Sequence, residues 1–311
     1  MDVIIHADDF GIEPAQSACI LECCAGVGQG DIAEKGLLNS LSIFANSPRF
    51  DECAALLDAR PAGLRLGVHL NFVEGPCCAD PAQIPLLVDE KGFFKLGYGG
   101  LLTGSFGGGA AELSCQLQVE AAAQIARVVG RFPHMADHLR LDGHQHTQLI
   151  PTVFKAVLGA AAASGCHLDY LRIPAEPTAS FLQSGTAASI APINWVKHEL
   201  LNRLWQMDRR LLAESGLGSY QDISAVFCGV LFSGHMDQER VAAVLPGLAQ
   251  VAEKRGMQLE LLFHPGRVND ARQCLNPDLP GFVEFSCGEG RDVEHDALLS
   301  VQLAQAVAAL Q

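Results

Sequence analysis

The chain has 311 residues, of which 35 are acidic and 21 basic, so its formal net charge is −14 at pH 7. This acidic balance, spread along the chain, argues against a basic surface that binds nucleic acid. Hydrophobic residues make up 49% of the sequence, enough for a substantial core in one large α/β domain.

The eleven cysteines include no Cys-x-x-Cys pair, so they indicate neither a zinc ribbon nor a thioredoxin-type site. Apart from the neighbours Cys23-Cys24 and Cys77-Cys78, most of the cysteines lie in apolar segments. Such free cysteines are typical of a reducing, cytoplasmic protein. The first residues carry no basic region before an apolar core, and we expect no signal peptide. The uncharged stretch at 177–196 is broken by Pro, Gly and polar residues, so we expect no membrane span.

Apolar, β-branched runs alternate with segments of helical period along the whole chain. We expect strands at 3–7, 38–45, 64–71, 139–142, 168–173, 225–232 and 259–264. We expect helices at 14–25, 49–59, 110–131, 151–164, 194–215, 238–255 and 293–310. This alternation predicts a parallel α/β architecture and one domain over residues 1–311.

Two long segments, 72–109 and 174–192, interrupt this alternation and are rich in Gly, Pro, Ser or Ala. Loops of this length in an α/β protein usually carry function or form lids. The glycines at 107–109 lack a preceding strand and a following Lys-Ser/Thr, so they do not predict a phosphate loop. The glycines at 26–30 follow a helix rather than a strand and do not predict a dinucleotide site.

Two adjacent carboxylates, Asp8 and Asp9, follow the first predicted strand. Neighbouring carboxylates repel each other and lose solvation at a strand end, and a bound cation or a division of roles relieves that cost. One of them could bind a divalent metal while the other acts as a base. Alternatively, the pair forms an acidic turn that caps the next helix.

Histidines stand at the ends of three further predicted strands: His69, the pair His144 and His146, and His264. Taken singly, each has an ordinary alternative as a core, turn or strand-end residue. In parallel α/β folds, however, sites assemble at the carboxyl ends of several strands. The recurrence of His and Asp at this one level therefore indicates a functional site.

A carboxylate with two neutral imidazoles forms a three-ligand set that leaves coordination positions open. This set suits Zn²⁺ or a first-row relative that activates water, whereas Mg²⁺ prefers oxygen ligands. A second carboxylate could take the proton of the water, and another His could protonate a leaving amine. Asp142 could cap a turn or orient one of the imidazoles.

These patterns together resemble the YdjC-like carbohydrate deacetylases, a family that includes chitooligosaccharide deacetylases and hopanoid-biosynthesis deacetylases. The four family motifs occur in order as Ala-Asp-Asp-Phe-Gly at 7–11, Gly-Val-His-Leu at 67–70, Asp-x-His-x-His at 142–146 and Phe-His-Pro-Gly at 263–266. Arg172-Ile173-Pro174, with Glu176, is similar to the family's R-x-P-x-E segment. The resemblance extends from the N-terminus to about residue 270.

The resemblance implies a distorted (β/α) barrel of about seven parallel strands, related to the NodB-type polysaccharide deacetylases and assembled as a homodimer. It implies that Asp9, His69 and His144 bind one divalent metal ion, Zn²⁺ or Mg²⁺, with no other cofactor. Asp8 would then be the general base.

The same resemblance places His264 and His146 close to the substrate. We expect His264 to be the general acid, with His146 as the alternative. Arg172 is a candidate substrate contact, and we group Glu176 and Asp142 with it.

The chain departs from the family pattern at three places. His6 stands where the family commonly has Asn, and Gln148 stands where it often has a third His. The segment 26–46 is longer than the usual helix-to-strand stretch. None of these departures touches the expected metal ligands.

We therefore expect a metal-dependent hydrolase that removes acetyl groups from a small N-acetylated amino sugar, such as a chitooligosaccharide or an N-acetylglucosaminyl conjugate. The alternatives are a metallo-phosphoesterase, which usually holds two or more metals, and a non-catalytic sugar-binding protein. The aromatic residues Phe93, Phe94 and Tyr98 could stack on sugar rings or pack within their own loop.

Overall fold

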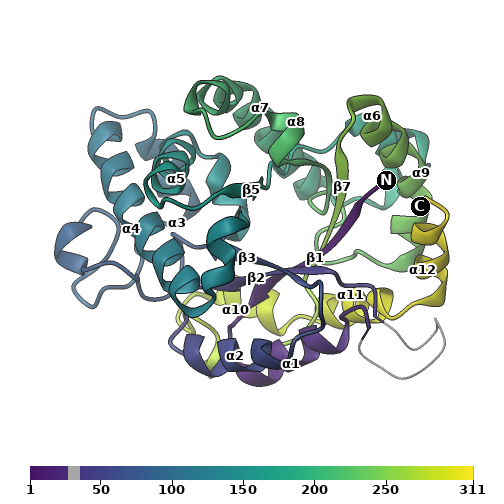
Figure 1. The fold of residues 1–311 in the computed structure, drawn as a ribbon, viewed down its shortest axis with the longest axis horizontal. Coiled ribbons are helices and arrows are strands. Elements are labelled where there is room, and N and C mark those ends of the chain that lie inside the picture. The colour runs from purple at the N-terminus through teal and green to yellow at the C-terminus, as the bar shows by residue number, and fades with distance from the viewer. Residues whose placement is uncertain (27–35, 311) are drawn as a thin grey trace.

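The computed structural model describes residues 1–26 and 36–310 (Figure 1). The long segment at 26–46 and the glycines at 26–30 therefore fall partly outside the described residues. Seven parallel strands form one sheet in the order β5-β4-β3-β2-β1-β7-β6. The strands are β1 Val3–Phe10, β2 Ser40–Phe44, β3 Arg65–Leu70, β4 Leu139–Gly143, β5 Leu168–Leu171, β6 Ala225–Cys228 and β7 Gln258–Phe263.

The strand order is the cyclic order of a barrel with one pairing missing. Each described strand pairs with its neighbour around the ring, except that β5 and β6 form the two edges. The helices surround the strands on several sides (Figure 1). Most of the strand residues are buried, as expected when helices cover a parallel sheet. The prediction of a distorted (β/α) barrel with seven strands is confirmed, and the barrel is open between β5 and β6.

Helices lie between successive strands along most of the described chain, and the last three follow β7. They are α1 Pro14–Glu22, α2 Phe50–Leu56, α3 Gly97–Gly104, α4 Ala110–Arg131, α5 Pro151–Ala163, α6 Thr178–Gln183, α7 Pro192–Ser215, α8 Tyr220–Ile223, α9 Gln238–Arg255, α10 Pro280–Cys287, α11 Gly290–Leu298 and α12 Val301–Ala308. No helix in the part of the chain that the structure describes has the length and apolarity needed to span a bilayer.

Two expected elements differ from those observed. The strand expected at 225–232 ends at Cys228, because the next three backbone N–H groups donate to the Glu176 carboxylate at 2.6–3.0 Å instead of to a strand. The helix expected at 293–310 is two helices, because Ser300 adopts an extended conformation and caps α12 by accepting from Leu303 N–H.

The strand register brings the functional residues to one edge of the sheet. Phe44 on β2 pairs with His69 on β3, and His69 pairs with Asp142 on β4. On the other side of β1, Ala7 pairs with Phe263, so His264 leaves β7 beside the paired carboxylates. All four sequence motifs therefore meet at the carboxyl end of the barrel.

Candidate active site

A bulge at the end of β1 turns both adjacent carboxylates toward one cavity. The register with β2 shifts between Ala7 and Phe10, and Asp9 has a left-handed backbone with φ of 65°. In a regular strand, successive side chains face opposite sides, so Asp8 and Asp9 would be separated. With the bulge, both line the same cavity of about 440 Å³.

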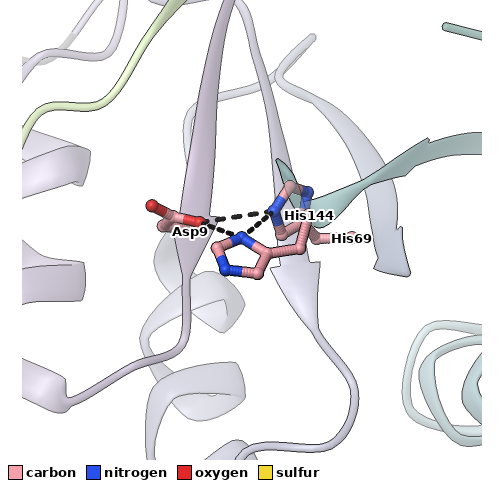
Figure 2. Close-up of side chains that lie close together, drawn as sticks. All are labelled: Asp9, His69 and His144. Atoms are coloured by element: carbon pink, nitrogen blue, oxygen red, sulfur yellow. Dashed lines mark hydrogen bonds and ion pairs between the residues drawn. The ribbon is translucent and has the colours of Figure 1, made fainter. Parts of the chain in front are cut away.

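Asp9, His69 and His144 converge from three strand ends (Figure 2). Asp9 Oδ1 lies 3.2 Å from His144 Nδ1 and 3.3 Å from His69 Nε2. The two imidazole nitrogens are 3.3 Å apart. The structure therefore brings together the three residues expected to bind the metal.

The triangle of ligand atoms has the dimensions of a metal site. A tetrahedral ion with bonds of about 2.0–2.1 Å separates its ligands by about 3.3 Å. Asp9 Oδ1 is buried and has no hydrogen-bond partner among the described residues. Burial by itself lowers the pKa of His69, but the neighbouring carboxylates of Asp8 and Asp142 raise this pKa to about 10. The site thus favours positive charge, and its donors fit a divalent ion.

A carboxylate lies beside the outer ring nitrogen of each of the two candidate histidine ligands. His69 Nδ1 lies 2.5 Å from Asp142 Oδ1, and His144 Nε2 lies 3.0 Å from Glu74 Oε1. Carboxylates in this position fix the tautomer of a metal-ligating imidazole. Asp142 is buried behind His69 and does not line the cavity, so its geometry favours orientation of the ring over contact with substrate.

Asp8 is held by the Arg172 guanidinium, whose Nη1 lies 2.8 Å from both carboxylate oxygens. Burial by itself would raise the pKa of Asp8, but Arg172 and His69 hold it well below its usual range. Arg172 also bonds Glu260 and is fully buried. Arg172, expected as a substrate contact, is therefore placed behind Asp8 rather than in the cavity.

Glu176 is likewise placed away from the cavity that Asp8 and Asp9 line. Its carboxylate accepts the backbone N–H groups of 229–231, the bonds that end β6. Burial raises the pKa of Glu176 to about 7. The observed contacts favour a structural role for this residue.

The two histidines of the Asp-x-His-x-His turn separate instead of converging. The strand ends at Gly143, and Gln145 and His146 adopt left-handed backbones with φ of 53° and 57°. His144 joins the metal triangle, whereas His146 lines another part of the cavity. Burial and the nearby Arg172 charge lower the pKa of His146 to about 3, so its ring is neutral at neutral pH.

His264 also lines the cavity. Its Nδ1 lies 3.4 Å from Glu294 Oε2, and its ring meets Phe285 edge-on at 5.1 Å. The turn that follows needs Gly266, with φ of 85°, because a Cβ there would lie 2.7 Å from the Gln16 carbonyl oxygen. This tight turn holds His264 at the cavity wall.

The remaining wall of the cavity is largely apolar. Helix α7 contributes Leu200, Leu201 and Lys197, and α10 contributes Phe282 and Phe285. Phe282 also stacks on the His144 ring at 5.5 Å. Among the three loop aromatics considered for sugar contact, Tyr98 lines the cavity, whereas the other two, at 93 and 94, pair within their own loop.

A second polar cluster beside the triangle consists of His6, Asp8 and Asp142. Arg172 already supplies positive charge to it, with Nη1 2.8 Å from Asp8 and Nη2 3.7 Å from Asp142. His6 Nε2 lies 3.2 Å from Asp8. The guanidinium thus takes the place that a second ion would need. The other departure, Gln148, lies outside the triangle and donates to the Arg172 carbonyl oxygen at 3.3 Å.

Three charged residues of the site were not expected from the sequence: Glu74, Arg291 and Glu294. Arg291 Nη2 lies 2.5 Å from Asp9 Oδ2, although the two residues are 282 positions apart. Glu74 lies only five residues after His69, so its proximity to that motif was the one available signal. No local pattern marks the other two.

Comparisons with known proteins show which proteins this chain is similar to. The sequence model of the family described as "YdjC-like protein" matches residues 2–309. A Mus musculus protein named carbohydrate deacetylase is 26% identical over 301 residues, which cover 93% of this chain and 82% of that protein. A chitooligosaccharide deacetylase of Escherichia fergusonii is 26% identical over 53% of this chain and 58% of its own length.

A solved structure from Enterococcus faecalis, described as a candidate cellobiose-phosphate cleavage protein, superposes with a TM-score of 0.63. It is 18% identical and covers 99% of this chain and 94% of its own chain. At this identity the likeness shows the fold.

Proposed function

Since the chain belongs to the YdjC-like protein family, we propose that it is a metal-dependent hydrolase that removes the acetyl group from an N-acetylated amino sugar. The observation that carries this proposal is the triangle of Asp9, His69 and His144 with Asp8 on the same cavity. The names of the relatives support a sugar substrate.

The donor set would hold one divalent ion through Asp9 Oδ1, His69 Nε2 and His144 Nδ1. Two imidazoles favour Zn²⁺ or a first-row relative over Mg²⁺. When bound, such an ion supplies Lewis-acid polarisation of an amide carbonyl and lowers the pKa of a water.

The residues of the chain supply the proton transfers. Asp8, kept ionised and oriented by Arg172, accepts a proton from the water that attacks the acetamide carbon. His264 donates a proton to the nitrogen as the C–N bond breaks, so that acetate and a free amine leave. The low pKa of His146 keeps its ring neutral at neutral pH, and a neutral imidazole is a very weak acid, which favours His264 as the proton donor.

The metallo-phosphoesterase alternative requires a second metal in most such sites. The second cluster of carboxylates already contains the buried Arg172 guanidinium, which supports a site for one ion. We also propose that residues 1–311 form one domain. The homodimer and the cytoplasmic location stay predictions.

The test is metal analysis together with acetate release from N,N′-diacetylchitobiose. We expect one equivalent of metal at this site in wild type, none there after His69→Ala, and full occupancy without turnover after Asp8→Asn. His138→Ala, which changes an exposed histidine, serves as the matched control. Turnover by metal-loaded Asp8→Asn would overturn the base assignment, and absence of metal from wild type would overturn the mechanism.

A further inference from the structure

A second group of metal-ligating side chains lies between α1 and α11, outside the candidate active site. Cys19 and Glu22 lie on α1, and His295 lies on α11. One ligand atom from each of the three lies within 4.8 Å of the others. The thiol, carboxylate and imidazole come from two helices that are far apart in the sequence.

The orientation of His295 suits a metal ligand. Its Nε2 is buried, has no hydrogen-bond partner among the described residues, and lies 3.9 Å from Glu22 Oε2. Its Nδ1 lies 3.5 Å from Asp296 Oδ1. A carboxylate at one ring nitrogen and a free second nitrogen is the arrangement that prepares histidine for a metal.

The local charge also favours a cation. Helix α1 ends at Glu22, and its last turn holds no basic residue, so the partial negative charge of the helix end is not neutralised there. Asp296 adds a further carboxylate, whereas nearby Asp292 is already paired with Arg267 at 3.1 Å. Burial, together with Glu22 and Asp292, raises the pKa of the Cys19 thiol.

We propose that Cys19, Glu22 and His295 form a second site, apart from the active centre, for a borderline-soft divalent ion such as Zn²⁺. Zn²⁺ accepts sulfur, nitrogen and oxygen donors, and these three side chains would leave its fourth position to water. Closing the triangle needs a small movement, which the 69% exposed Glu22 side chain is free to make.

The position of the site relative to the active centre gives the ion a role. The side chain of Gln16, on α1, donates to the Asp9 carbonyl oxygen at 3.0 Å, and Arg291, on α11, binds the Asp9 carboxylate. An ion that joins α1 to α11 would hold together the two helices that position Asp9. The site is therefore expected to stabilise the fold rather than to take part in the reaction.

Sulfur distinguishes this site from the active centre, whose donors are oxygen and nitrogen only. The experiment titrates Co²⁺ into the full chain carrying His69→Ala, which removes the active-site triangle. We expect one equivalent to bind with a thiolate-to-cobalt charge-transfer band in the near ultraviolet. Cys19→Ser should abolish the band, whereas Cys115→Ser, a change at an exposed cysteine, should keep it.

A second variant tests the imidazole without removing the thiol. His295→Asn should weaken Co²⁺ binding by more than the roughly tenfold that loss of a mere outer-shell partner costs. Zn²⁺ should raise the Tm of the His69→Ala protein, and Cys19→Ser should remove that rise. Absence of the band from the His69→Ala protein, or its persistence after Cys19→Ser, would overturn the proposal; neither outcome bears on deacetylation.

Discussion

Arg291 Nη2 lies 2.5 Å from Asp9 Oδ2, while the other oxygen of the same carboxylate faces His69 and His144. Arg291 and Asp9 are each about 2% exposed or less. Arg291 also donates to the carbonyl oxygen of Phe285, at 3.0 Å, in the cavity wall. One guanidinium therefore orients the candidate metal ligand and anchors the helix beside it.

Replacement of Arg291 should destabilise the metal-free protein more than the metal-loaded protein. Arg291→Met leaves the Asp9 carboxylate buried and unpaired, a change that costs about 3–5 kcal/mol of the free energy of unfolding. A bound divalent ion would compensate part of that charge. Urea unfolding with Zn²⁺ and with a chelator measures both values. Arg203→Met, at an exposed ion pair with Glu199, is the control, and an equal loss in the two variants would contradict the prediction.

Glu74 should control metal affinity through the His144 ring, whose Nε2 it meets at 3.0 Å. Glu74→Gln keeps the shape of the side chain but removes the charge that fixes the imidazole. Loss of such an outer partner lowers metal affinity by about 10- to 100-fold. Competition with a chelator measures the affinity. Glu90→Gln, at an exposed loop residue, should change nothing; equal affinities for the Glu74 variant and wild type would disprove this role.

Arg172 should be needed both for stability and for the reactivity of Asp8. Arg172→Met would leave the buried carboxylates of Asp8 and Glu260 without their cation, and we expect a loss of about 3–5 kcal/mol or failure to fold. Arg172→Lys keeps the charge but cannot bridge both carboxylates with a planar fork. We expect this conservative variant to retain metal and to lose most of its kcat. An unchanged kcat would show that Arg172 does not position Asp8 for the reaction.

Asp208 offers a pH-dependent test of the fold away from the active site. Burial raises the pKa of Asp208 to about 7, and its Oδ2 has no hydrogen-bond partner among the described residues. The folded state therefore keeps a proton that the unfolded state releases from about pH 4 upward, so stability falls with rising pH until about pH 7 and then stays level.

Asp208→Asn should remove this fall, and its advantage over wild type should reach on the order of 2–4 kcal/mol above pH 7. Urea unfolding across this range measures the difference between the two proteins. Asp51→Asn, at an 88% exposed side chain, should show no such trend. A constant difference at all pH values would rule out the buried carboxyl as its source.

Most strands and helices of the barrel could be predicted from the sequence, because each has its own local pattern of apolar residues. The bounds of α4 and α9 were predicted without error; α9, for example, begins after the capping Asp237 and ends at the left-handed Gly256. In contrast, α10 has only eight residues and begins with Pro-Gly. It is too short to show a clear helical period of apolar residues. The aromatic wall that it provides was therefore missed.

The strand pattern placed Asp9, His69 and His144 at the carboxyl ends of strands in one parallel sheet, and the family resemblance singled them out as ligands. What the sequence could not show is which way each side chain turns. The left-handed backbones of Asp9 and His146 are rare for residues other than glycine, and they decide which groups join the triangle. Arg172 was identified as important, but its burial depends on packing against Glu260, 88 residues away.

The contact between Arg291 and Asp9 also determines how late in translation the candidate site can form. Strand β1 is synthesised before the other strands of the sheet, and the partner of its Asp9 carboxylate follows 282 residues later in the chain. Until that arginine emerges, Oδ2 of the Asp9 carboxylate lacks the cation that pairs with it. A chain released a few codons before residue 291 would carry every candidate ligand but not the guanidinium that holds Asp9.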